Sequence, residues 1–326
     1  MKIKVGINGF GRRGRSLCRV LLKHEEFQIV AINDPFLTAT EMMNQLTFDS
    51  IYGILNGITV TSEDSISLLG QPVHTTHCMS PIEIPWKQYG VSVVFECSGR
   101  FTTLTQCEGH RAAGCERVIV ATPSKDIPMV CKHVSESTAP IISIASPSTC
   151  CMAPLLQILS TLSPIDHVSF TVVHSITSQQ QVMDQINPEE TDLRVGRAAG
   201  LNIIPMRSSA SQCLPLLLPW TEGHLSGHSV HVPSFNGCLA EIDVQFSTYQ
   251  SREAVLSHLQ DSVKYGGMKD VIGLTDEDLV SSDLLQCPTS CVVDQKLLSV
   301  CNNHLHLSCW FDNEWSYCSR AIEFAM

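Results

Sequence analysis

The sequence is short of basic residues and has no long apolar run. Its 326 residues include 21 lysines and arginines against 32 aspartates and glutamates, a formal net charge of −11 at pH 7. Sequence-independent binding to nucleic acid requires positive charge on the protein, so we expect no nucleic-acid partner. No apolar stretch approaches the about 20 residues that span a bilayer, so we expect no membrane partner. Residues 1–4 lead directly into a strand pattern without a signal peptide, which predicts a cytoplasmic location.

The sequence also lacks the pattern of a disulfide framework, although cysteine is abundant. The fifteen cysteines are an odd number and are scattered from Cys18 to Cys318. In a long chain without a secretory signal, this indicates free thiols in a reducing compartment. Four residues near the C-terminus are of zinc-ligand types: Cys287, Cys291, Cys301 and His304. Their spacing is looser than in the usual zinc pairs, so we interpret them as loop and core thiols and expect no metal.

The first thirty-four residues carry the pattern of a dinucleotide-binding βαβ unit. Ile3, Val5 and Ile7 alternate into a turn whose glycines follow the spacing G-x-G-x-x-G, at Gly9, Gly11 and Gly14. A helical period follows, then a second strand pattern over 27–32 that ends at Asp34. The glycines permit a tight turn and a close approach of the pyrophosphate, and the acid at the end of the second strand can bond the ribose hydroxyls.

Two kinds of strand pattern divide the chain. Near-continuous β-branched runs at 91–97, 117–121 and 140–143 predict an α/β fold with a doubly wound parallel sheet. After Pro154 the apolar residues alternate instead, over 168–174, 229–232, 239–246 and 305–309. That pattern predicts a second, α+β domain with a mostly antiparallel sheet. A long polar segment, 178–196, interrupts this half and indicates a functional or interface loop.

Several stretches together resemble the glyceraldehyde-3-phosphate dehydrogenase family over nearly the whole chain. They are Asn8-Gly9-Phe10-Gly11-Arg12, Ala31-Ile32-Asn33-Asp34, Phe101-Thr102-Thr103, Val173-His174-Ser175, Asn202-Ile203-Ile204-Pro205, Val280-Ser281-Ser282-Asp283 and Asp312-Asn313-Glu314. Within 180–199, three segments are more similar to the erythrose-4-phosphate dehydrogenase branch: Gln180-Gln181-Val182, Asp192-Leu193-Arg194 and Arg197-Ala198-Ala199. The resemblance implies an NAD-binding domain over 1–146, a catalytic-type domain over 147–312, and a C-terminal helix over 313–326 that returns to the first domain.

The resemblance also implies a glycolytic oxidoreductase, but the central stretch departs from the family pattern. The family sequence S-N-A-S-C-T-T-N-C supplies a cysteine thiolate that attacks an aldehyde, with a histidine as base. Here His174 matches the base, whereas Pro147 stands at the position of the nucleophile. Proline has no nucleophilic atom and no N–H to donate to an oxyanion. We therefore expect a pseudoenzyme that is impaired in thiol-dependent aldehyde oxidation.

An active enzyme is the alternative hypothesis. Cys150 follows the lost position by one helical turn, so its Cβ is expected roughly 5–6 Å away from it. Misplacement by about 1 Å can already cost a hundredfold in rate, which disfavours this thiol as a substitute. A non-covalent reaction with His174 as base is the other active route.

The remaining site residues are those that match the family's binding positions. The resemblance implies substrate contacts at Ser146, Ser148, Thr149, Thr177, Arg197, Ser208 and His231, and cofactor contacts at Gly9, Phe10, Gly11, Arg12, Gly14, Asp34, Asn313 and Tyr317. His231 replaces an arginine, which exchanges a permanent charge for a group largely neutral at pH 7. Arg13 replaces an isoleucine that packs against the nicotinamide ring in the family. We expect NAD to bind more weakly than in active relatives.

The family forms homotetramers, and this implies a homo-oligomer, or a mixed oligomer with active relatives, for this chain. Two departures from the family affect the expected geometry of a tetramer. The later part of the loop 178–196 is altered, and the C-terminal helix is short.

Overall fold

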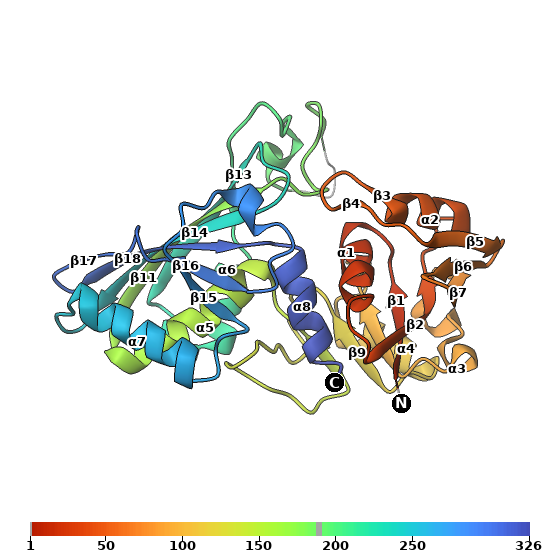
Figure 1. Ribbon diagram of the computed structural model, residues 1–326, viewed down its shortest axis with the longest axis horizontal. Helices are drawn as coiled ribbons and strands as arrows, with labels where there is room; N and C mark the ends of the chain where they lie inside the picture. The colour runs from red at the N-terminus through yellow and green to blue at the C-terminus, as the bar shows by residue number, and fades with distance from the viewer. Residues whose placement is uncertain (1, 187–190) are drawn as a thin grey trace. The chain divides into compact units, whose positions relative to one another are not determined.

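The computed structural model describes residues 2–186 and 191–326, which form two compact units (Figure 1). The first unit comprises Met1–Val130, Ser137–Ala145 and Cys318–Met326, and the second comprises Cys131–Glu136 and Ser146–Tyr317. Residues 187–190 of the polar loop lie outside the described residues.

The first unit is built on an eight-stranded sheet with the order β10-β9-β8-β1-β2-β7-β6-β5. Its strands are β1 (Ile3–Asn8), β2 (Phe27–Asn33), β5 (Ile58–Ser62), β6 (Ser65–Leu68), β7 (Gln71–Thr76), β8 (Val93–Glu96), β9 (Arg117–Val120) and β10 (Ile141–Ser143). All pairs from β10 to β7 are parallel, and β6 and β5 continue the sheet antiparallel. Strand β1 lies between β2 and β8, so the order reverses there. Ligands of open α/β sheets bind at the carboxyl ends of strands at such a switch point.

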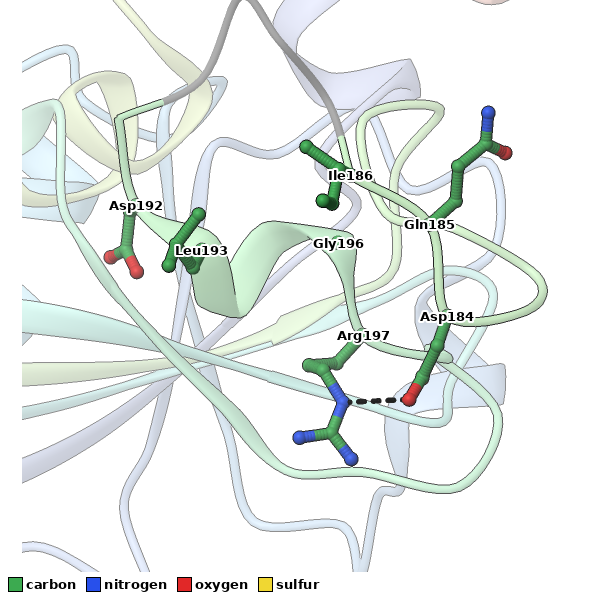
Figure 2. Close-up of a pocket in the computed structure, with 7 residues that line it drawn as sticks. All are labelled: Asp184, Gln185, Ile186, Asp192, Leu193, Gly196 and Arg197. Carbon is green, nitrogen blue, oxygen red and sulfur yellow. Dashed lines mark hydrogen bonds and ion pairs between the residues drawn. The ribbon is translucent and has the colours of Figure 1, made fainter.

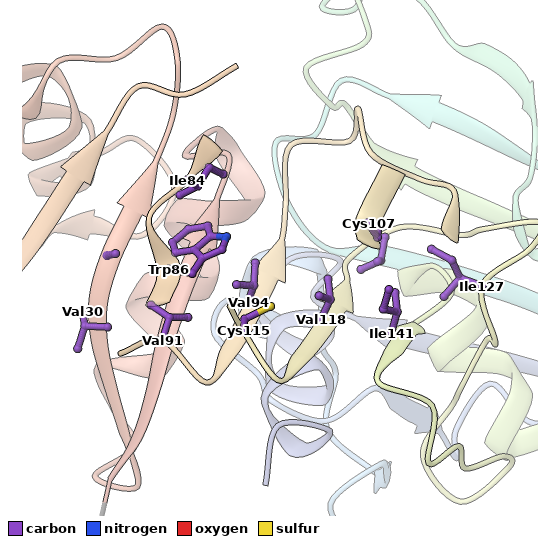
Figure 3. Packing of buried hydrophobic residues seen from close by; sticks show 12 residues of the cluster. Val30, Ile84, Trp86, Val91, Val94, Cys107, Cys115, Val118, Ile127 and Ile141 are labelled. Atoms are coloured by element: carbon purple, nitrogen blue, oxygen red, sulfur yellow. The ribbon is translucent and has the colours of Figure 1, made fainter. Parts of the chain in front are cut away.

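Buried apolar side chains from strands and helices fill the core of the first unit. The helices are α1 (Arg12–Leu21), α2 (Ala39–Thr47), α3 (Trp86–Tyr89), α4 (Leu104–Ala112) and the 3-10 turn η1 (Pro81–Glu83), and a short hairpin joins β3 (Phe48–Asp49) to β4 (Gly53–Ile54). One cluster brings together Val30, Trp86, Val94, Val118 and Ile141 with seven further residues (Figure 3). Val94, Val118 and Ile141 come from the β-branched runs that predicted the parallel sheet, because strands buried on both faces need apolar side chains on both.

The second unit contains a mixed sheet with the order β12-β13-β11-β14-β18-β16-β15, and β17 pairs with β18. The strands are β11 (Ile165–Ser175), β12 (Ile204–Arg207), β13 (Leu225–Val232), β14 (Cys238–Phe246), β15 (Ile272–Thr275), β16 (Cys291–Asp294), β17 (Ser299–Cys301) and β18 (His304–Phe311). Most pairs are antiparallel, while β11–β13 and β15–β16 are parallel. Its longer helices are α5 (Pro147–Leu162), α6 (Ala210–Leu217) and α7 (Arg252–Tyr265), and its 3-10 turns are η2 (Leu193–Gly196), η3 (Pro219–Thr221) and η4 (Ser281–Leu284). Helix α8 (Trp315–Glu323) begins in the second unit and belongs to the first unit from Cys318 onward.

Helix α5 is the central helix of the second unit, where it packs against β11, α6 and α7. Most of its side chains are buried, including the run from Ser148 to Leu156. A helix that is apolar on nearly all sides is expected to lie inside a core.

The expected fold class is confirmed: a mostly parallel α/β unit is joined to a unit with a mostly antiparallel sheet. The antiparallel edge β5–β6–β7 was not anticipated, because its short strands carry many polar residues. Among the described residues, no helix has the length and apolar character needed to cross a bilayer.

Candidate functional site

The glycine turn joins β1 to α1 at the switch point of the first sheet. Gly9 has φ +87°, a conformation that disfavours side chains. A Cβ on Gly14 would lie 2.1 Å from the Gly9 carbonyl oxygen, so only glycine lets α1 approach the turn so closely. A Cβ on Gly11 would meet nothing within 4 Å, and α1 begins there without a side-chain cap. The N–H groups at this helix end are thus free of a capping side chain and suited to an anion.

Asp34 lies beside this turn, at the end of β2. Its carboxylate accepts a hydrogen bond from the Phe10 N–H at 2.8 Å and another from the Phe36 N–H at 3.0 Å. Both bonds orient the carboxylate. Phe36 in turn lies under the guanidinium of Arg100, 5.1 Å from the ring centroid.

A pocket of about 230 Å³ opens at the same edge of the sheet. Among the residues that line it are Asn8, Gly9, Gly11, Asn33, Asp34, Phe36, Arg100 and Phe101. The predicted residues Gly9, Gly11 and Asp34 therefore line one cavity. Beneath it, the Asn8 amide donates to the buried Glu96 carboxylate at 2.5 Å and His110 contacts the same carboxylate at 2.9 Å.

The two arginines of the turn are engaged within the first unit. Arg12 forms an ion pair with Asp49 and lies 5.0 Å from the centroid of the Tyr52 ring. Although burial opposes it, the Tyr52 N–H and the Arg12 charge hold the pKa of Asp49 below its usual value. Arg13 donates a hydrogen bond to the Ala121 carbonyl, directly after β9. Its side chain thus runs along the carboxyl edge of the sheet.

Helix α5 begins at Pro147, the position where the sequence predicts that the nucleophile is lost. Ala145 has φ +56°, Ser146 caps the helix by accepting from the Thr149 N–H at 3.3 Å, and Pro147 is the first helical residue. Proline suits this position because its N–H would have no partner inside the helix. The Ser146 hydroxyl also contacts those of Thr149 at 2.7 Å and Ser148 at 3.3 Å. The sulfur-bearing Cys150 is only 4% exposed.

His174 and His231 lie side by side on the neighbouring strands β11 and β13. They are Cα partners in the register, their ring centroids are 4.6 Å apart, and the Nδ1 of each contacts the Ser175 carbonyl oxygen, at 2.7 and 2.9 Å. Because a carbonyl only accepts, each Nδ1 donates. Burial and then the charge of His174 lower the pKa of His231 to about 4.

The pKa of His174 moves the opposite way, to about 9. Burial lowers it, but the neighbouring Cys238, through charge and a hydrogen bond, and the Ser175 carbonyl outweigh that effect. Cys238, at the start of β14, was missed by sequence reasoning. Its position opposite the strand of His174 could have pointed to it. Using that signal, however, requires knowing that β11 pairs with β14, although the two residues are more than sixty positions apart in the sequence.

Asn313 joins the same neighbourhood of the second unit. Its Oδ1 accepts from the Ser175 hydroxyl at 3.1 Å, and that hydroxyl lies 3.9 Å from the Cys238 sulfur. Tyr317, on α8, is 1% exposed. The cofactor roles of both residues stay predictions.

The predicted substrate residues are not all gathered in one place. Thr177 donates from both its N–H and its hydroxyl to the Gln180 side chain, and Ser208 accepts from the Ala210 N–H at the start of α6. Arg197 bonds Asp184 at 3.0 Å in a separate pocket of about 280 Å³ (Figure 2). That pocket is lined by Asp184, Gln185, Ile186, Asp192, Leu193, Gly196 and Arg197, none of which belongs to the histidine pair.

The cysteines considered as zinc ligands do not form a metal site in the described part of the chain, where no three His, Cys, Asp or Glu side chains are placed to hold an ion. Cys301 is exposed, whereas Cys291 is buried and hydrogen-bonded to the thiols of Cys151 and Cys309. All fifteen cysteines are free thiols.

The switch-point pocket and the second unit with its histidine pair define a two-domain protein of the dinucleotide-dependent dehydrogenase class. Residues 3–104 match the family model "Glyceraldehyde 3-phosphate dehydrogenase, NAD binding domain", and residues 146–313 match "Glyceraldehyde 3-phosphate dehydrogenase, C-terminal domain". The chain therefore belongs to the glyceraldehyde-3-phosphate dehydrogenase family.

Individual relatives are similar over essentially their whole length. The chain is 36% identical to the cytosolic glyceraldehyde-3-phosphate dehydrogenase of Magnolia liliiflora, covering 100% of this chain and 96% of the relative. It is also 36% identical to glyceraldehyde-3-phosphate dehydrogenase 1 of Giardia intestinalis, covering 100% and 97%. The enzyme of Colletotrichum lindemuthianum is 35% identical, covering 98% and 96%.

The family assignment makes NAD the cofactor of the nucleotide site, and the residues present fit it. Gly11 leaves open the space that a Cβ would fill beside the helix end, and the Asp34 carboxylate stands at the edge of the same pocket. A carboxylate there can accept from ribose hydroxyls and would repel a 2′-phosphate.

Proposed function

We propose that this chain is an NAD-binding member of its family in which thiol-dependent aldehyde oxidation is impaired. The observation that carries the proposal is Pro147 at the first position of α5. A thiolate at a helix N-terminus beside an imidazole is nucleophilic and also leaves well, and a family member needs both properties to form and release a thioester. Proline offers no atom for either step.

The neighbouring residues do not replace that atom. The hydroxyls of Ser146, Ser148 and Thr149 bond one another at the helix start, and Cys150 is buried one turn further along. At neutral pH, His174 carries a proton and is a poor base, while His231 is uncharged where an arginine would bind phosphate. Bound NAD would accept a hydride. Without a nucleophilic thiol, the chain would not form the covalent thiohemiacetal that donates this hydride.

A dehydrogenase assay tests the proposal. Purified protein is incubated with a triose or tetrose phosphate aldehyde, NAD and inorganic phosphate, and NADH is followed by its absorbance. We expect a rate at least about 10⁴-fold below that of an active relative, as for loss of a catalytic nucleophile. A rate typical of the family would overturn the proposal.

The alternative is an active NAD-dependent sugar-phosphate aldehyde dehydrogenase that uses Cys150 or a non-covalent route with His174. Slow NADH formation abolished by Cys150→Ser would establish the first route. Formation that survives this substitution but is lost in His174→Asn would establish the second.

We further propose a homo-oligomer, a tetramer by family habit, or a mixed oligomer with active relatives. Support comes from the full-length similarity and from exposed apolar side chains of the second unit: Val182, Met183, Ile186, Leu193, Leu201 and Ile203. A cytoplasmic location is proposed because similar plant proteins carry the name cytosolic. Native mass spectrometry of the purified chain, alone and with an active relative, distinguishes the two oligomers; a monomer at micromolar concentration would contradict both.

A further inference from the structure

Four neighbouring strands of the first sheet end in polar residues whose side chains form one continuous chain of hydrogen bonds. The strands are β8, β1, β2 and β7, and their last residues, Glu96, Asn8, Asn33 and Thr76, are Cα partners in the register. The Thr76 hydroxyl donates to Asn33 Oδ1 at 2.8 Å, and the Asn33 amide donates to Asn8 Oδ1 at the same distance. The Asn8 amide then donates to Glu96 Oε2 at 2.5 Å. Every step along this edge of the sheet therefore donates toward Glu96.

A second arm of hydrogen bonds reaches the same carboxylate from outside the sheet. The Trp86 indole, part of the apolar cluster in Figure 3, donates its N–H to His110 Nδ1 at 3.0 Å. This nitrogen accepts, so the ring proton of His110 lies on Nε2. That nitrogen is 2.9 Å from Glu96 Oε2 and donates to it. Both arms thus end on one oxygen of Glu96.

Groups that can only donate close both arms. On the sheet side, the Cys78 backbone N–H donates to Asn33 Oδ1 at 2.9 Å, and on the other side the Trp86 indole is a donor only. Neither arm can therefore reverse, and the group where they meet has to accept from both. The Glu96 carboxylate does so with Oε2, while its Oε1 accepts from the Ser98 N–H at 2.7 Å and from the Ser98 hydroxyl.

The residues oriented in this way form part of the wall of the nucleotide pocket. Asn8, Asn33, Cys78 and Ser98 all line the cavity of about 230 Å³ at the switch point. Glu96 is only 1% exposed, so water does not replace a hydrogen bond that this carboxylate loses. The polar groups that a nucleotide meets on this wall are thus oriented by one buried carboxylate.

We propose that Glu96 is a positioning residue of the nucleotide site, which fixes the direction of the Asn8 and Asn33 amides and holds the turn at Ser98. His110 assists by holding the carboxylate at Oε2. The inference rests on the NAD binding of the proposed function and is independent of the lost thiol. Glutamine is the informative replacement at position 96, because its NH₂ group would face two donors whichever way the amide is turned.

Calorimetry with ADP-ribose, which lacks the nicotinamide ring, tests the role of Glu96. The affinity of Glu96→Gln should fall at least about tenfold relative to the unmodified chain, because buried donors lose their acceptor. Asp294→Asn is the matched control, since this carboxylate is also buried but lies at the end of β16 in the second unit, where it accepts from the N–H groups of Lys296 and Leu297. It should lower the free energy of unfolding and leave the ADP-ribose affinity within about twofold of the unmodified chain, because it lies outside the network.

Two results of this experiment have different meanings. Equal ADP-ribose affinity in Glu96→Gln and the unmodified chain would overturn the inference alone. No binding of ADP-ribose to the unmodified chain would refute the proposed NAD binding, and the inference with it.

A pair of variants at His110 separates positioning from stability, and decides the question if Glu96→Gln does not fold. Glutamine at this position can still donate an amide proton to Glu96, whereas leucine cannot. We expect His110→Gln to bind ADP-ribose within about twofold of the unmodified chain, and His110→Leu to bind it at least about fivefold more weakly. Equal affinities in the two variants, whatever their stabilities, would contradict the inference.

Discussion

At the scale of single residues, the histidine pair shows how one carbonyl oxygen can serve two rings of different charge. His174 and His231 both donate to the Ser175 carbonyl, yet the pKa of one is raised to about 9 and that of the other lowered to about 4. The difference arises from the third partner, because only His174 contacts the Cys238 thiol and each ring disfavours a charge on the other. The pair therefore holds one positive charge at neutral pH.

The two rings should oppose one another in the pH dependence of stability. Because the folded pKa of His231 lies below the unfolded value, its contribution is present above about pH 6.5 and is lost as the pH falls toward 4. Because the folded pKa of His174 lies above the unfolded value, its contribution is present below about pH 6.5 and is lost as the pH rises through 9. Urea unfolding from pH 4 to 7 should show a smaller loss of stability on acidification in His231→Asn than in the unmodified chain. Parallel curves would contradict this assignment.

The sequence predicted some site residues and missed others for a physical reason. The glycine spacing and Asp34 are local signals, since the turn and the strand end are close in the chain. Cys238 becomes relevant only through strand pairing, and the engagement of Arg197 by Asp184 depends on the path of a long loop. Arg13 was expected to weaken the binding of NAD, but its hydrogen bond to the Ala121 carbonyl could not be foreseen, because the two residues are far apart in the sequence.

At the scale of elements, the start of α5 shows why the fold accommodates proline at position 147. Pro147 occupies the first helical position, and Ser146 supplies the cap. Removing the cap in Ser146→Ala should destabilise the protein by about 1 kcal/mol, measured by urea unfolding. Ser160→Ala in the same helix is the control, because within residues 2–186 and 191–326 its hydroxyl bonds only the Gln157 carbonyl one turn back. It should change stability by less than about 0.5 kcal/mol. Equal losses of unfolding free energy in both variants would show that the Ser146 cap contributes no more to stability than the Ser160 hydroxyl.

Elements with strong β-branched or alternating patterns were predictable, whereas the short polar strands and the parallel pair inside the second sheet were not. The runs at 117–121 and 140–143 correspond to β9 and β10, and 239–246 lies within β14. The parallel pairing of β11 with β13 could not be predicted from the sequence. Alternating apolar residues show which face of a strand is buried, but not whether the neighbouring strand runs parallel or antiparallel to it. Strands β5 and β6 are short and largely hydroxyl-bearing, so neither pattern marked them.

At the scale of the whole molecule, the cofactor should bind mainly through its adenosine half. The pocket at the switch point and Asp34 belong to the first unit, while Arg13 stands where the family resemblance implies an apolar residue against the nicotinamide ring. By calorimetry, NAD and ADP-ribose should bind the unmodified chain with dissociation constants within about threefold of each other. A threefold ratio is a difference of less than 1 kcal/mol in binding free energy, because 1 kcal/mol corresponds to about a fivefold change. Arg13→Ile should tighten NAD and leave ADP-ribose unchanged.

Two results would contradict that expectation. NAD binding tenfold or more tighter than ADP-ribose in the unmodified chain would show that the ring pocket functions despite Arg13. An absence of NAD binding at millimolar cofactor would show that the glycine turn serves packing alone.

The bend that precedes α5 has a practical consequence for anyone who wishes to alter this protein. Ala145 has a left-handed backbone conformation, which costs an alanine about 1–2 kcal/mol and a glycine far less. Under the proposed function, this bend leads into α5 at Pro147 and positions no reactive thiol. Ala145→Gly is therefore expected to raise the melting temperature, and under the proposed function it would cost no thiol-dependent activity.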